Sequence, residues 1–440
     1  MLLNQPHPLE TRVLTRRFEY PQRDPIWVDE FVAKQGYEGF RKALGMPPDE
    51  IIDEVKKSSL RGRGGAGFPA GLKWSFVDRK SSKPKYVVVN GDEGEPGTCK
   101  DRVLMEHDPH RLIEGCLICA RAIGAERGWV YIRGEYRFHI DILDKAIEQA
   151  YERGYLGENI LGSGMTFHLS THTGAGSYEC GEESALLESL EGKRGNPRLK
   201  PPFPATVGAF QCPTTVNNVE TFCAVPDILL NGGDWYHALG TPKNGGTRLV
   251  CLSGHINNPG VYEVPLGFNM KRLIEEIGGG VWKGRKLKAV IPGGSSSPIL
   301  TADEIDIPAD YDSLAKAGSM LGSGATMICD ETTDMVKLLA RVMKFYAHES
   351  CGWCIPCREG TAWLAKILAR LDEGAGMTRD IDMIDQLATS MFGRTFCALG
   401  DAAAMPAMSI VRKFRHEFEA KIGSAEVFVP APGTQPLVVL

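Results

Sequence analysis

The sequence predicts an α/β protein in three parts: a parallel-sheet domain, a small β-grasp domain and a C-terminal four-helix bundle. Three observations predict it. Strand and helix patterns alternate over residues 86–171, a hairpin pattern opens a new unit near residue 247, and residues 331–440 are dominated by helical patterns. Alternating strands and helices favour parallel strands joined by right-handed crossovers.

The composition sets limits on what the protein does. The chain has 440 residues, a hydrophobic fraction of 43%, a charged fraction of 24% and a net charge of −5, which argues against a nucleic-acid partner. Most of its 12 cysteines are scattered, so we expect a reducing compartment rather than a disulfide framework. No segment resembles a signal or transit peptide, and no apolar run approaches the roughly 18 residues that would insert in a membrane.

Residues 1–60 are predicted as a polar lead-in that ends in a helix over residues 47–60, where Ile51, Ile52 and Val55 form one apolar stripe. The glycine-rich segment RGRGGAGFPAGLKW, residues 61–74, follows. It contains the spacing of a dinucleotide fingerprint, but that fingerprint must follow a strand and open a helix. Here a helix precedes it and an extended, proline-containing stretch is expected after it, so we reject an ordinary Rossmann turn.

Even without a Rossmann turn, this glycine-rich segment is a candidate ligand-binding loop. Its backbone can be approached closely by a flat or phosphorylated ligand. Phe68 and Phe76 offer faces for stacking, and Lys73 offers a counter-charge for phosphate. The alternative is a flexible surface loop with a solvated lysine.

The alternating region follows. Its predicted strands and helices are Tyr86–Asn90, residues 109–123, Trp129–Arg133, Arg137–Glu152 and Thr166–Thr171. In parallel sheets, ligands bind beyond the carboxyl ends of the strands.

Two acidic, glycine-containing segments lie where that rule places a ligand. NGDEGEPG, residues 90–97, follows the first strand, and HTGAGSYECGEESALLESLEG, residues 172–192, follows the third. Acids in a first helical turn are usually caps. Acids gathered at one sheet edge can instead accept hydrogen bonds from ribitol or ribose hydroxyls, or hold a positively charged ring.

Residues 193–221 form a Pro-rich passage that contains Lys200 and Phe203, and Asn217–Asn218 close it. Adjacent asparagines often make turns, but next to a phosphate they would donate amide hydrogens. Residues 247–330 then show a hairpin around residues 257–260, a helix (MKRLIEEI) and strands Leu287–Ile291 and Ala325–Cys329, the order of a β-grasp unit. This unit shows no chemistry, so we expect a spacer or docking domain.

The last part is predicted to hold helices at about 332–347, 358–372, 380–391 and 401–421. Cys351, Cys354 and Cys357 share one interhelical loop, SCGWCIPCREG, and Cys397 lies in another. A four-helix bundle would bring both loops to one end. A compact CxxCxxC with a remote cysteine is typical of a cubane iron–sulfur cluster, whereas structural zinc sites usually divide their ligands into two pairs. Zinc and buried core thiols are the alternatives.

Five motifs in order, GRGGAGFPAGLKW, NGDEGEPG, GAGSYECGEESAL, NNVET and ESCGWCIPCREG, resemble one family over nearly the whole chain. It is the NADH- and FMN-binding (51-kDa-type) flavoprotein subunit of respiratory complex I, NADH:quinone oxidoreductase. The resemblance implies that NADH passes hydride to FMN, which releases single electrons to a [4Fe–4S] cluster. It also implies a modified Rossmann-like FMN/NADH domain over residues 61–240, a ubiquitin-like domain over 241–330 and a cluster-bearing bundle over 331–440.

The resemblance assigns roles to individual residues. The nucleotide loop takes Gly62, Arg63, Gly64 and Gly67, and the flavin pocket takes Lys73, Asn90, Asp92, Tyr178, Gly181, Glu182, Asn217 and Asn218. Glu93 and Thr221, in the same motifs, complete the cofactor set. Phe68, Phe76, Lys200 and Phe203 match positions that hold the dinucleotide, and Cys351, Cys354, Cys357 and Cys397 match the cluster ligands.

Glu95 and Glu183 match acids close to the nicotinamide and are the predicted catalytic pair, acting by alignment and electrostatics rather than as acid and base. Either is a candidate for the acid that rejects NADPH. Three positions depart from the family pattern: Gly91 replaces the usual alanine, Glu179 replaces an apolar residue, and FQC at residues 210–212 replaces a tryptophan-containing form.

Family partners implied by the resemblance are a thioredoxin-like [2Fe–2S] subunit (24-kDa type) and a large iron–sulfur subunit (75-kDa type). We expect a cytoplasmic protein held peripherally, through the complex, on the cytoplasmic side of a bacterial inner membrane. A second hypothesis with the same chemistry is the diaphorase subunit of an NAD-linked hydrogenase or formate dehydrogenase. A third is a non-catalytic scaffold stabilised by zinc, which leaves the glycine-rich and acidic loops unexplained.

Overall fold

The predicted parallel sheet is present in the computed structural model, which describes residues 5–20 and 24–422. The strand order is β3-β2-β1-β4, with every neighbouring pair parallel. The strands are β1 (Tyr86–Gly91), β2 (Arg127–Ile132), β3 (His168–Thr173) and β4 (Thr214–Asn218). The first three confirm the predicted strands to within about two residues. The fourth was not predicted: Asn217 and Asn218 end a strand that pairs with β1 from Thr214 onward, so the alternative of a simple asparagine turn does not apply.

The two faces of this sheet are covered by different helices. Val87 and Val89 face a large core shared with α6 and α9, whereas Val88 and Val216 face a smaller core shared with α8. The helices of this part are α5 (Lys100–His107), α6 (Pro109–Ile123), α7 (Arg137–Glu152), α8 (Glu183–Leu190), α9 (Val219–Asn231) and α10 (Gly233–Ala238). Alternate valines on opposite faces make a three-layer arrangement, helix–sheet–helix.

The segment before the glycine-rich loop is not a polar lead-in. It forms α1 (Val28–Ala33), α2 (Glu38–Leu44) and α3 (Pro48–Lys57), which bury Phe31, Tyr37 and Phe40 in the large core. The buried carboxylate of Glu114 on α6 accepts hydrogen bonds from the backbone N–H groups of Tyr37 (3.0 Å) and Phe40 (3.1 Å). These contacts fasten α2 to the sheet domain.

A short helix, α4 (Ala70–Ser75), follows the glycine-rich loop where an extended stretch was expected. Pro69 precedes it with φ −60°, a value that proline imposes and that leads readily into a helix. Helix α3, and not a strand, is the element directly before the loop, so the rejection of an ordinary Rossmann turn still holds.

The second sheet is mixed, in the order β6-β5-β9-β7-β8. Its strands are β5 (Thr247–Gly254), β6 (Gly260–Pro265), β7 (Leu287–Ile291), β8 (Leu300–Thr301) and β9 (Ala325–Asp330). The predicted hairpin of β5 and β6 is antiparallel, and the central pair β5–β9 is parallel. The predicted helix begins as α11 (Met270–Arg272) and continues as a π-helical turn over Leu273–Ile277. A further helix, α12 (Tyr311–Lys316), was not predicted.

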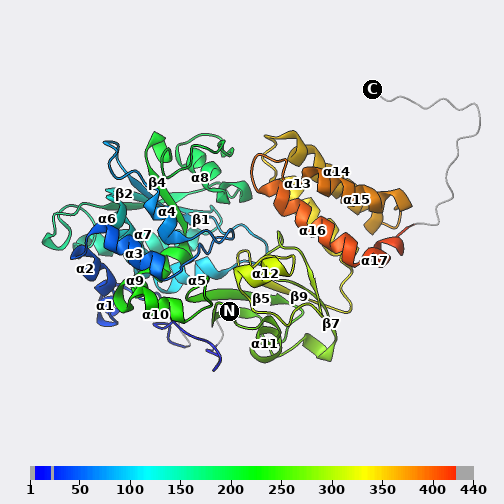
Figure 1. Ribbon diagram of the computed structural model, residues 1–440, viewed down its shortest axis with the longest axis horizontal. Coiled ribbons are helices and arrows are strands. Elements are labelled where there is room, and N and C mark those ends of the chain that lie inside the picture. Colours follow the sequence, from blue (N-terminus) through cyan, green and yellow to red (C-terminus); the bar gives the residue numbers. More distant parts are fainter. Residues whose placement is uncertain (1–4, 21–23, 423–440) are drawn as a thin grey trace, which may run out of the picture.

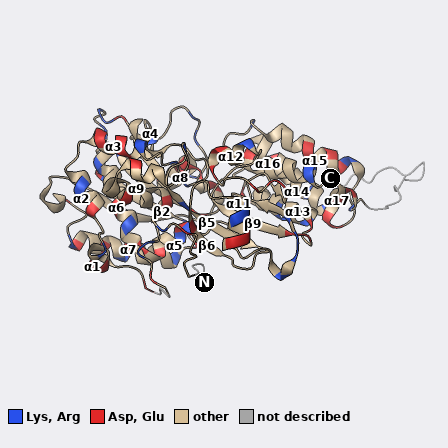
Figure 2. Cartoon of the chain, turned by 60° about the horizontal axis from the view of Figure 1, so that its bottom comes forward, with Lys and Arg blue, Asp and Glu red and all other residues tan. Residues whose placement is uncertain are grey.

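The C-terminal helices are α13 (Met335–Glu349), α14 (Ile355–Asp372), α15 (Thr378–Met391), α16 (Leu399–Lys413) and α17 (Arg415–Glu419). The last predicted helix, 401–421, is divided in two at Phe414, whose backbone is not helical. Figure 1 shows the sheet domain, the second sheet and this bundle side by side, with the bundle at one end of the molecule. Basic and acidic residues are interspersed along the helices at both ends (Figure 2). None of the described helices is both long and apolar enough to cross a bilayer.

Close packing of α6 against α9 requires glycine at position 115, because a Cβ there would lie 2.1 Å from the carbonyl oxygen of Phe222. We predict that Gly115→Ala lowers the free energy of unfolding by about 1–3 kcal/mol, since backbone must move to admit the methyl group. Gly45→Ala is the matched control, because its nearest contact would be at 3.5 Å and its φ is −81°. Equal denaturation midpoints for the two variants would contradict this packing.

Candidate functional site

The predicted ligand loops gather at the carboxyl edge of the parallel sheet. Asn90, at the end of β1, donates through its side-chain amide to the carbonyl of Gly181, 2.8 Å away in the loop before α8. The amide of Asn218, at the end of β4, lies 3.4 Å from the carbonyl of Asn90. Trp74, just after the glycine-rich loop, donates its indole N–H to the side chain of Asn217 at 2.9 Å. Four chain segments therefore meet at one edge.

The glycine-rich loop is closed and pinned from the second sheet domain. The N–H of Gly62 donates to the carbonyl of Phe68 (2.8 Å), which closes the loop on itself. The hydroxyl of Tyr311 donates to the carbonyl of Gly62 (2.8 Å). Gly67 has φ +67°, and a Cβ there would lie 2.6 Å from the Tyr311 ring, so glycine is required. Sequence reasoning missed Tyr311, because no local motif marks a side chain that acts across about 250 residues.

Two residues assigned to the cofactor set support this loop from behind. Arg63 is fully buried, and its guanidinium donates to the carbonyls of Gly245 (3.0 Å) and Thr247 (2.9 Å). The hydroxyl of Thr221 accepts a hydrogen bond from the backbone N–H of Arg63 (2.9 Å). Both side chains hold the loop in place and do not face its open side, whereas Gly64 lies over the side chain of Asn218.

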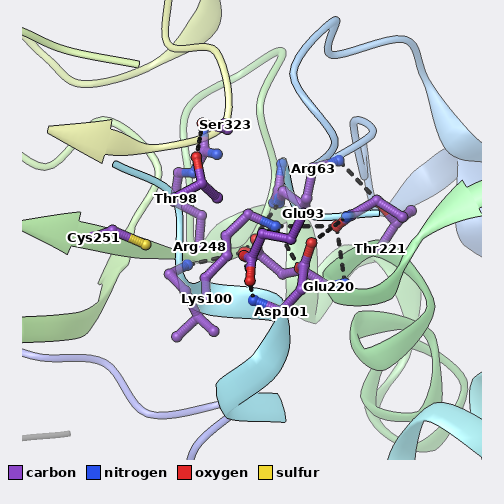
Figure 3. Close-up of polar contacts among 12 residues, drawn as sticks. Arg63, Glu93, Thr98, Lys100, Asp101, Glu220, Thr221, Arg248, Cys251 and Ser323 are labelled. Carbon is purple, nitrogen blue, oxygen red and sulfur yellow. Dashed lines mark hydrogen bonds and ion pairs between the residues drawn. The ribbon is translucent and has the colours of Figure 1, made fainter. Parts of the chain in front are cut away.

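A buried charge network lies beneath the loops (Figure 3). Its central residues, Lys100, Asp101 and Glu220, were not identified from the sequence. The ammonium of Lys100 is 2.7 Å from Asp101 Oδ1, 2.9 Å from Glu220 Oε2 and 3.1 Å from Asn218 Oδ1. Burial opposes its charge, but Asp101 and Glu220 raise the pKa of Lys100 above its ordinary value. Glu220 also accepts the backbone N–H of Leu249 on β5 (2.9 Å), so the network joins the two sheets.

Acids of the first loop have separate surroundings. Glu93 is buried and accepts hydrogen bonds from the N–H of Asp101 (2.8 Å) and the hydroxyl of Tyr136 (3.0 Å), so it caps α5 instead of facing a ligand. Burial raises the pKa of Glu93 to about 8. Burial also raises the pKa of Asp92 to about 7, and its Oδ2 atom has no hydrogen-bond partner among the described residues. Asp92 is therefore the acid left available to a hydroxyl donor.

Glu95 is held from two directions. The Tyr178 hydroxyl donates to one carboxylate oxygen (2.6 Å), and the backbone N–H of Ser296 (2.8 Å) and hydroxyl of Ser295 (3.2 Å) donate to the other. Ser295 and Ser296 belong to the loop between β7 and β8, so the second sheet domain contributes to the site. The expectation that this domain carries no chemistry is wrong in that respect.

At the outer side of the site, two lysines and two glutamates form a chain of ion pairs. Lys73 Nζ lies 2.6 Å from Glu183 Oε2, and Lys200 Nζ lies 3.1 Å from Glu183 Oε1 and 2.6 Å from Glu182 Oε1. Burial opposes ionisation of Glu183, but Lys73 and Lys200 hold its pKa below the ordinary value. Glu182 is the N-cap residue of α8, and its other oxygen accepts the backbone N–H groups of Ser184 and Ala185. Phe68, Phe76 and Phe203 are exposed, and the ring centroids of Phe68 and Phe76 lie 6.3 Å apart.

The four predicted cluster ligands line one small cavity, where both interhelical loops reach the same end of the bundle. Cys354 is the N-cap residue of α14, Cys357 lies in its first turn, and Cys397 precedes α16. Trp353 lines the cavity beside Phe396, with ring centroids 6.3 Å apart, whereas Ile355 is 66% exposed and is not one of the lining residues. Within residues 5–20 and 24–422, no three His, Cys, Asp or Glu side chains are arranged around a single metal-ion position.

Two consecutive residues connect this cavity to the loops at the sheet edge. Tyr178 bonds Glu95 as described, and its ring packs against Phe345 and Tyr346 of α13 at centroid distances of 5.2 and 6.1 Å. Glu179, the next residue, lines the cysteine cavity. Burial raises the pKa of Glu179 to about 7.

Comparison with known proteins identifies the family. A family model described as the Nuo51 FMN-binding domain matches residues 55–227, an SLBB domain matches 248–314, and the NADH-ubiquinone oxidoreductase-F iron-sulfur binding region matches 337–421. The second F subunit of NADH-quinone oxidoreductase from Rhizobium meliloti is 53% identical over 93% of this chain and 97% of its own length. The chain belongs to the family of NADH-quinone oxidoreductase F subunits. The F subunit of Streptomyces coelicolor is 50% identical over 93% of this chain and 92% of its own.

Among solved structures, a chain of an NAD+-reducing [NiFe]-hydrogenase in the H2-reduced state matches with a TM-score of 0.79 and 37% identity. The match covers 87% of this chain and 65% of the hydrogenase chain. The shared fold agrees with the second hypothesis, while the curated relatives favour the first.

These matches confirm the predicted family and the predicted cofactors, FMN, NADH and a [4Fe–4S] cluster. They cover the glycine-rich loop, the acidic loops and the cysteine loops in the predicted order. The roles of individual residues stay predictions.

Lys100 forms ion pairs with two buried acids beneath the site, Asp101 and Glu220. We predict that Lys100→Met lowers the free energy of unfolding by about 3–5 kcal/mol, because Asp101 and Glu220 would lose a buried partner. The measurement is denaturant unfolding of purified protein, with the change Lys80→Met at an exposed lysine as control. If the two variants unfold at the same denaturant concentration, the network is not holding the sheets together.

Proposed function

We propose that this chain is the electron-input subunit of an NADH:quinone oxidoreductase. NADH is oxidised at the edge of the parallel sheet, and electrons leave through the cysteine cavity of the bundle. The observation that supports the proposal is that Tyr178 bonds Glu95 at the sheet edge while the next residue, Glu179, lines the cysteine cavity. Such contact suits a protein that must transfer electrons between two bound groups.

The sheet edge fits a flavin. FMN, when bound, would accept one hydride, which carries two electrons, and release those electrons singly, a chemistry that the protein's own side chains do not supply. The unpartnered Oδ2 atom of Asp92 would accept a ribitol hydroxyl, and the exposed backbone beside Gly65 leaves room for phosphate. The remaining flavin contacts would come from Lys73, Asn90, Tyr178, Gly181, Glu182, Asn217 and Asn218.

The outer rim fits the dinucleotide. Phe68, Phe76 and Phe203 expose 46%, 56% and 57% of their surfaces, so they are free to stack on adenine. Lys200 offers charge to a phosphate, and Glu183 offers an acceptor to a ribose hydroxyl. Glu95, fixed by Tyr178 and Ser296, would align the nicotinamide.

The cysteine cavity fits an iron–sulfur cluster because its donor set is four thiols with an aromatic side wall. Cys351, Cys354, Cys357 and Cys397 would be the ligands. The domain division that we propose is a helical lead-in over 1–60, the Rossmann-like domain over 61–240, the ubiquitin-like domain over 241–330 and the cluster-bearing bundle over 331–440.

The partners that we propose are the thioredoxin-like [2Fe–2S] subunit and the large iron–sulfur subunit of the complex, at the cytoplasmic side of a bacterial inner membrane. The runner-up is the diaphorase subunit of a hydrogenase, which the solved-structure match favours. Purification of the tagged chain from its source distinguishes them. Co-purified quinone-reducing membrane subunits support the first assignment, and a co-purified nickel–iron subunit supports the second.

Glu183 tests the nucleotide site. We predict that Glu183→Gln raises the KM for NADH about tenfold, since loss of one charge-assisted hydrogen bond is worth about 1.4 kcal/mol. Thermal stability should change far less, because Lys200 keeps its pairing with Glu182. Glu188→Gln, on the same helix but paired with Arg198, is the control and should retain the wild-type KM. Wild-type NADH kinetics in Glu183→Gln would show that Glu183 only stabilises the start of α8 and does not bind the nucleotide.

Cys397 tests the cluster site. We expect Cys397→Ala to lose most of its iron and acid-labile sulfide while keeping FMN, because this cysteine lies in the bundle and outside the sheet-edge loops. Iron, sulfide and flavin are measured on anaerobically purified protein. Cys212→Ala, at a buried cysteine outside the cavity, should keep wild-type iron. Unchanged iron in Cys397→Ala would refute its assignment as a ligand.

A further inference from the structure

A loop of the second sheet domain closes against Glu95, the acid predicted to lie close to the nicotinamide. The loop runs between β7 and β8, and its residues Ser295 and Ser296 are buried, whereas Glu95 is only half-buried. The N–H of Gly294 donates to the carbonyl of Ala325 on β9 (2.8 Å), which fixes the loop to its own sheet. A Cβ at Gly294 would lie 2.6 Å from Glu95 Cγ, so the backbone of the loop and the glutamate side chain are in direct contact.

A second hydroxyl lies behind Ser295. The hydroxyl of Tyr346, on α13 of the bundle, is 3.1 Å from the hydroxyl oxygen of Ser295, which in turn donates to Glu95 Oε1 at 3.2 Å. A hydroxyl carries one hydrogen, so Ser295, when it donates to Glu95, can only accept from Tyr346. Tyr346 is therefore the donor, and it sets the direction in which the Ser295 hydrogen points. Hydrogen bonds in such a chain polarise and strengthen one another.

The surrounding packing holds Tyr346 in this position. The residue is fully buried, and its ring packs edge-on against that of Tyr178, with centroids 6.1 Å apart. Three residues further along α13, Glu349 accepts the N–H of Tyr178 (3.1 Å), and the Tyr178 hydroxyl donates to Glu95 Oε2 (2.6 Å). The end of α13 thus reaches both oxygens of the Glu95 carboxylate, one through Ser295 and the other through Tyr178.

We propose that Tyr346 is a positioning residue for NADH oxidation, which orients the Glu95 carboxylate through the hydroxyl of Ser295. The inference rests on the proposed function, in which Glu95 aligns the nicotinamide, and it extends that site to a residue of the helical bundle. A carboxylate held at both oxygens keeps one orientation, and precise alignment of a reacting ring depends on supporting contacts of this kind. Without the Tyr346 hydroxyl, Ser295 is free to turn away from Glu95.

The test measures the rate of flavin reduction by NADH in the intact complex, by stopped-flow absorbance at saturating NADH. Tyr346→Phe keeps the ring and removes only the hydroxyl, so we expect flavin reduction about fivefold slower than in wild type, the size of one neutral hydrogen bond. The NADH concentration that gives half the maximal rate, and the flavin and iron contents, should not change. Tyr37→Phe is the matched control, because it removes an equally buried hydroxyl, 2.8 Å from His110 Nδ1 in the large core, and should keep the wild-type rate.

A double-mutant cycle separates this role from a general effect on the fold. Glu95→Ala removes the carboxylate and with it the group that Ser295 orients, so it should also slow flavin reduction. Adding Tyr346→Phe to Glu95→Ala should slow the reaction no further, because the Tyr346 hydroxyl acts only through Glu95. Equal fivefold losses in the wild-type and Glu95→Ala backgrounds would show that Tyr346 acts by another route, and would overturn the proposal.

The remaining outcomes distinguish this proposal from the proposed function. A wild-type rate in Tyr346→Phe beside a slow rate in Glu95→Ala would overturn the role of Tyr346 and leave the proposed function intact. A wild-type rate in Glu95→Ala would remove Glu95 from the nucleotide site, and the role of Tyr346 with it. If Tyr346→Phe does not assemble, Ser295→Ala cuts the same chain of hydroxyls. A slow rate there that is not additive with Glu95→Ala supports the proposal, and a wild-type rate overturns it.

Discussion

The ion pairs of Lys100 with Asp101 and Glu220 are the constraint on which the rest of the site depends. They lie where the carboxyl ends of β1 and β4 approach the second sheet, and all three side chains are almost completely buried. Through Glu220 they reach Leu249 on β5 and, at 4.0 Å, the guanidinium of Arg63 behind the glycine-rich loop. Charges buried in this way are tolerated only when each has a partner, so the two sheets and the loop must keep one arrangement.

The second sheet domain completes the site and is not merely a spacer. It supplies Tyr311 to close the glycine-rich loop and the Ser295–Ser296 pair to hold Glu95. These contacts come from loops and a short helix, while its core is separate from that of the first sheet for most residues. A domain can therefore hold a side chain of the site, here Glu95, in place even though no sequence motif marks the residues that hold it.

Sequence reasoning succeeded where the signal was local. The alternating strands, the bundle and the four cysteines follow from periodicity and spacing, and the acidic loops follow from their place after strands. It did not predict β4, because Thr214, Thr215 and Val216, which favour a strand, lie within the Pro-rich passage and were assigned to it. It also missed Lys100, because two of its three close partners, Asn218 and Glu220, lie more than about 100 residues away in the sequence. Arg63 and Glu93 were expected to face ligands, but their contacts, which depend on tertiary structure, turn them inward.

Adjacency of Tyr178 and Glu179 carries a consequence for electron transfer. Consecutive Cα atoms are held about 3.8 Å apart by the covalent chain, whatever the surrounding domains do. One of these side chains bonds Glu95, the acid predicted to lie close to the nicotinamide, and the other lines the cysteine cavity. A relative movement of the bundle and the sheet domain would have to break the bonds of Tyr178 to Glu95 or to Glu349 before it separated the two sites. The short turn before α8 thus links the loops at the sheet edge to the cysteine cavity through two consecutive residues.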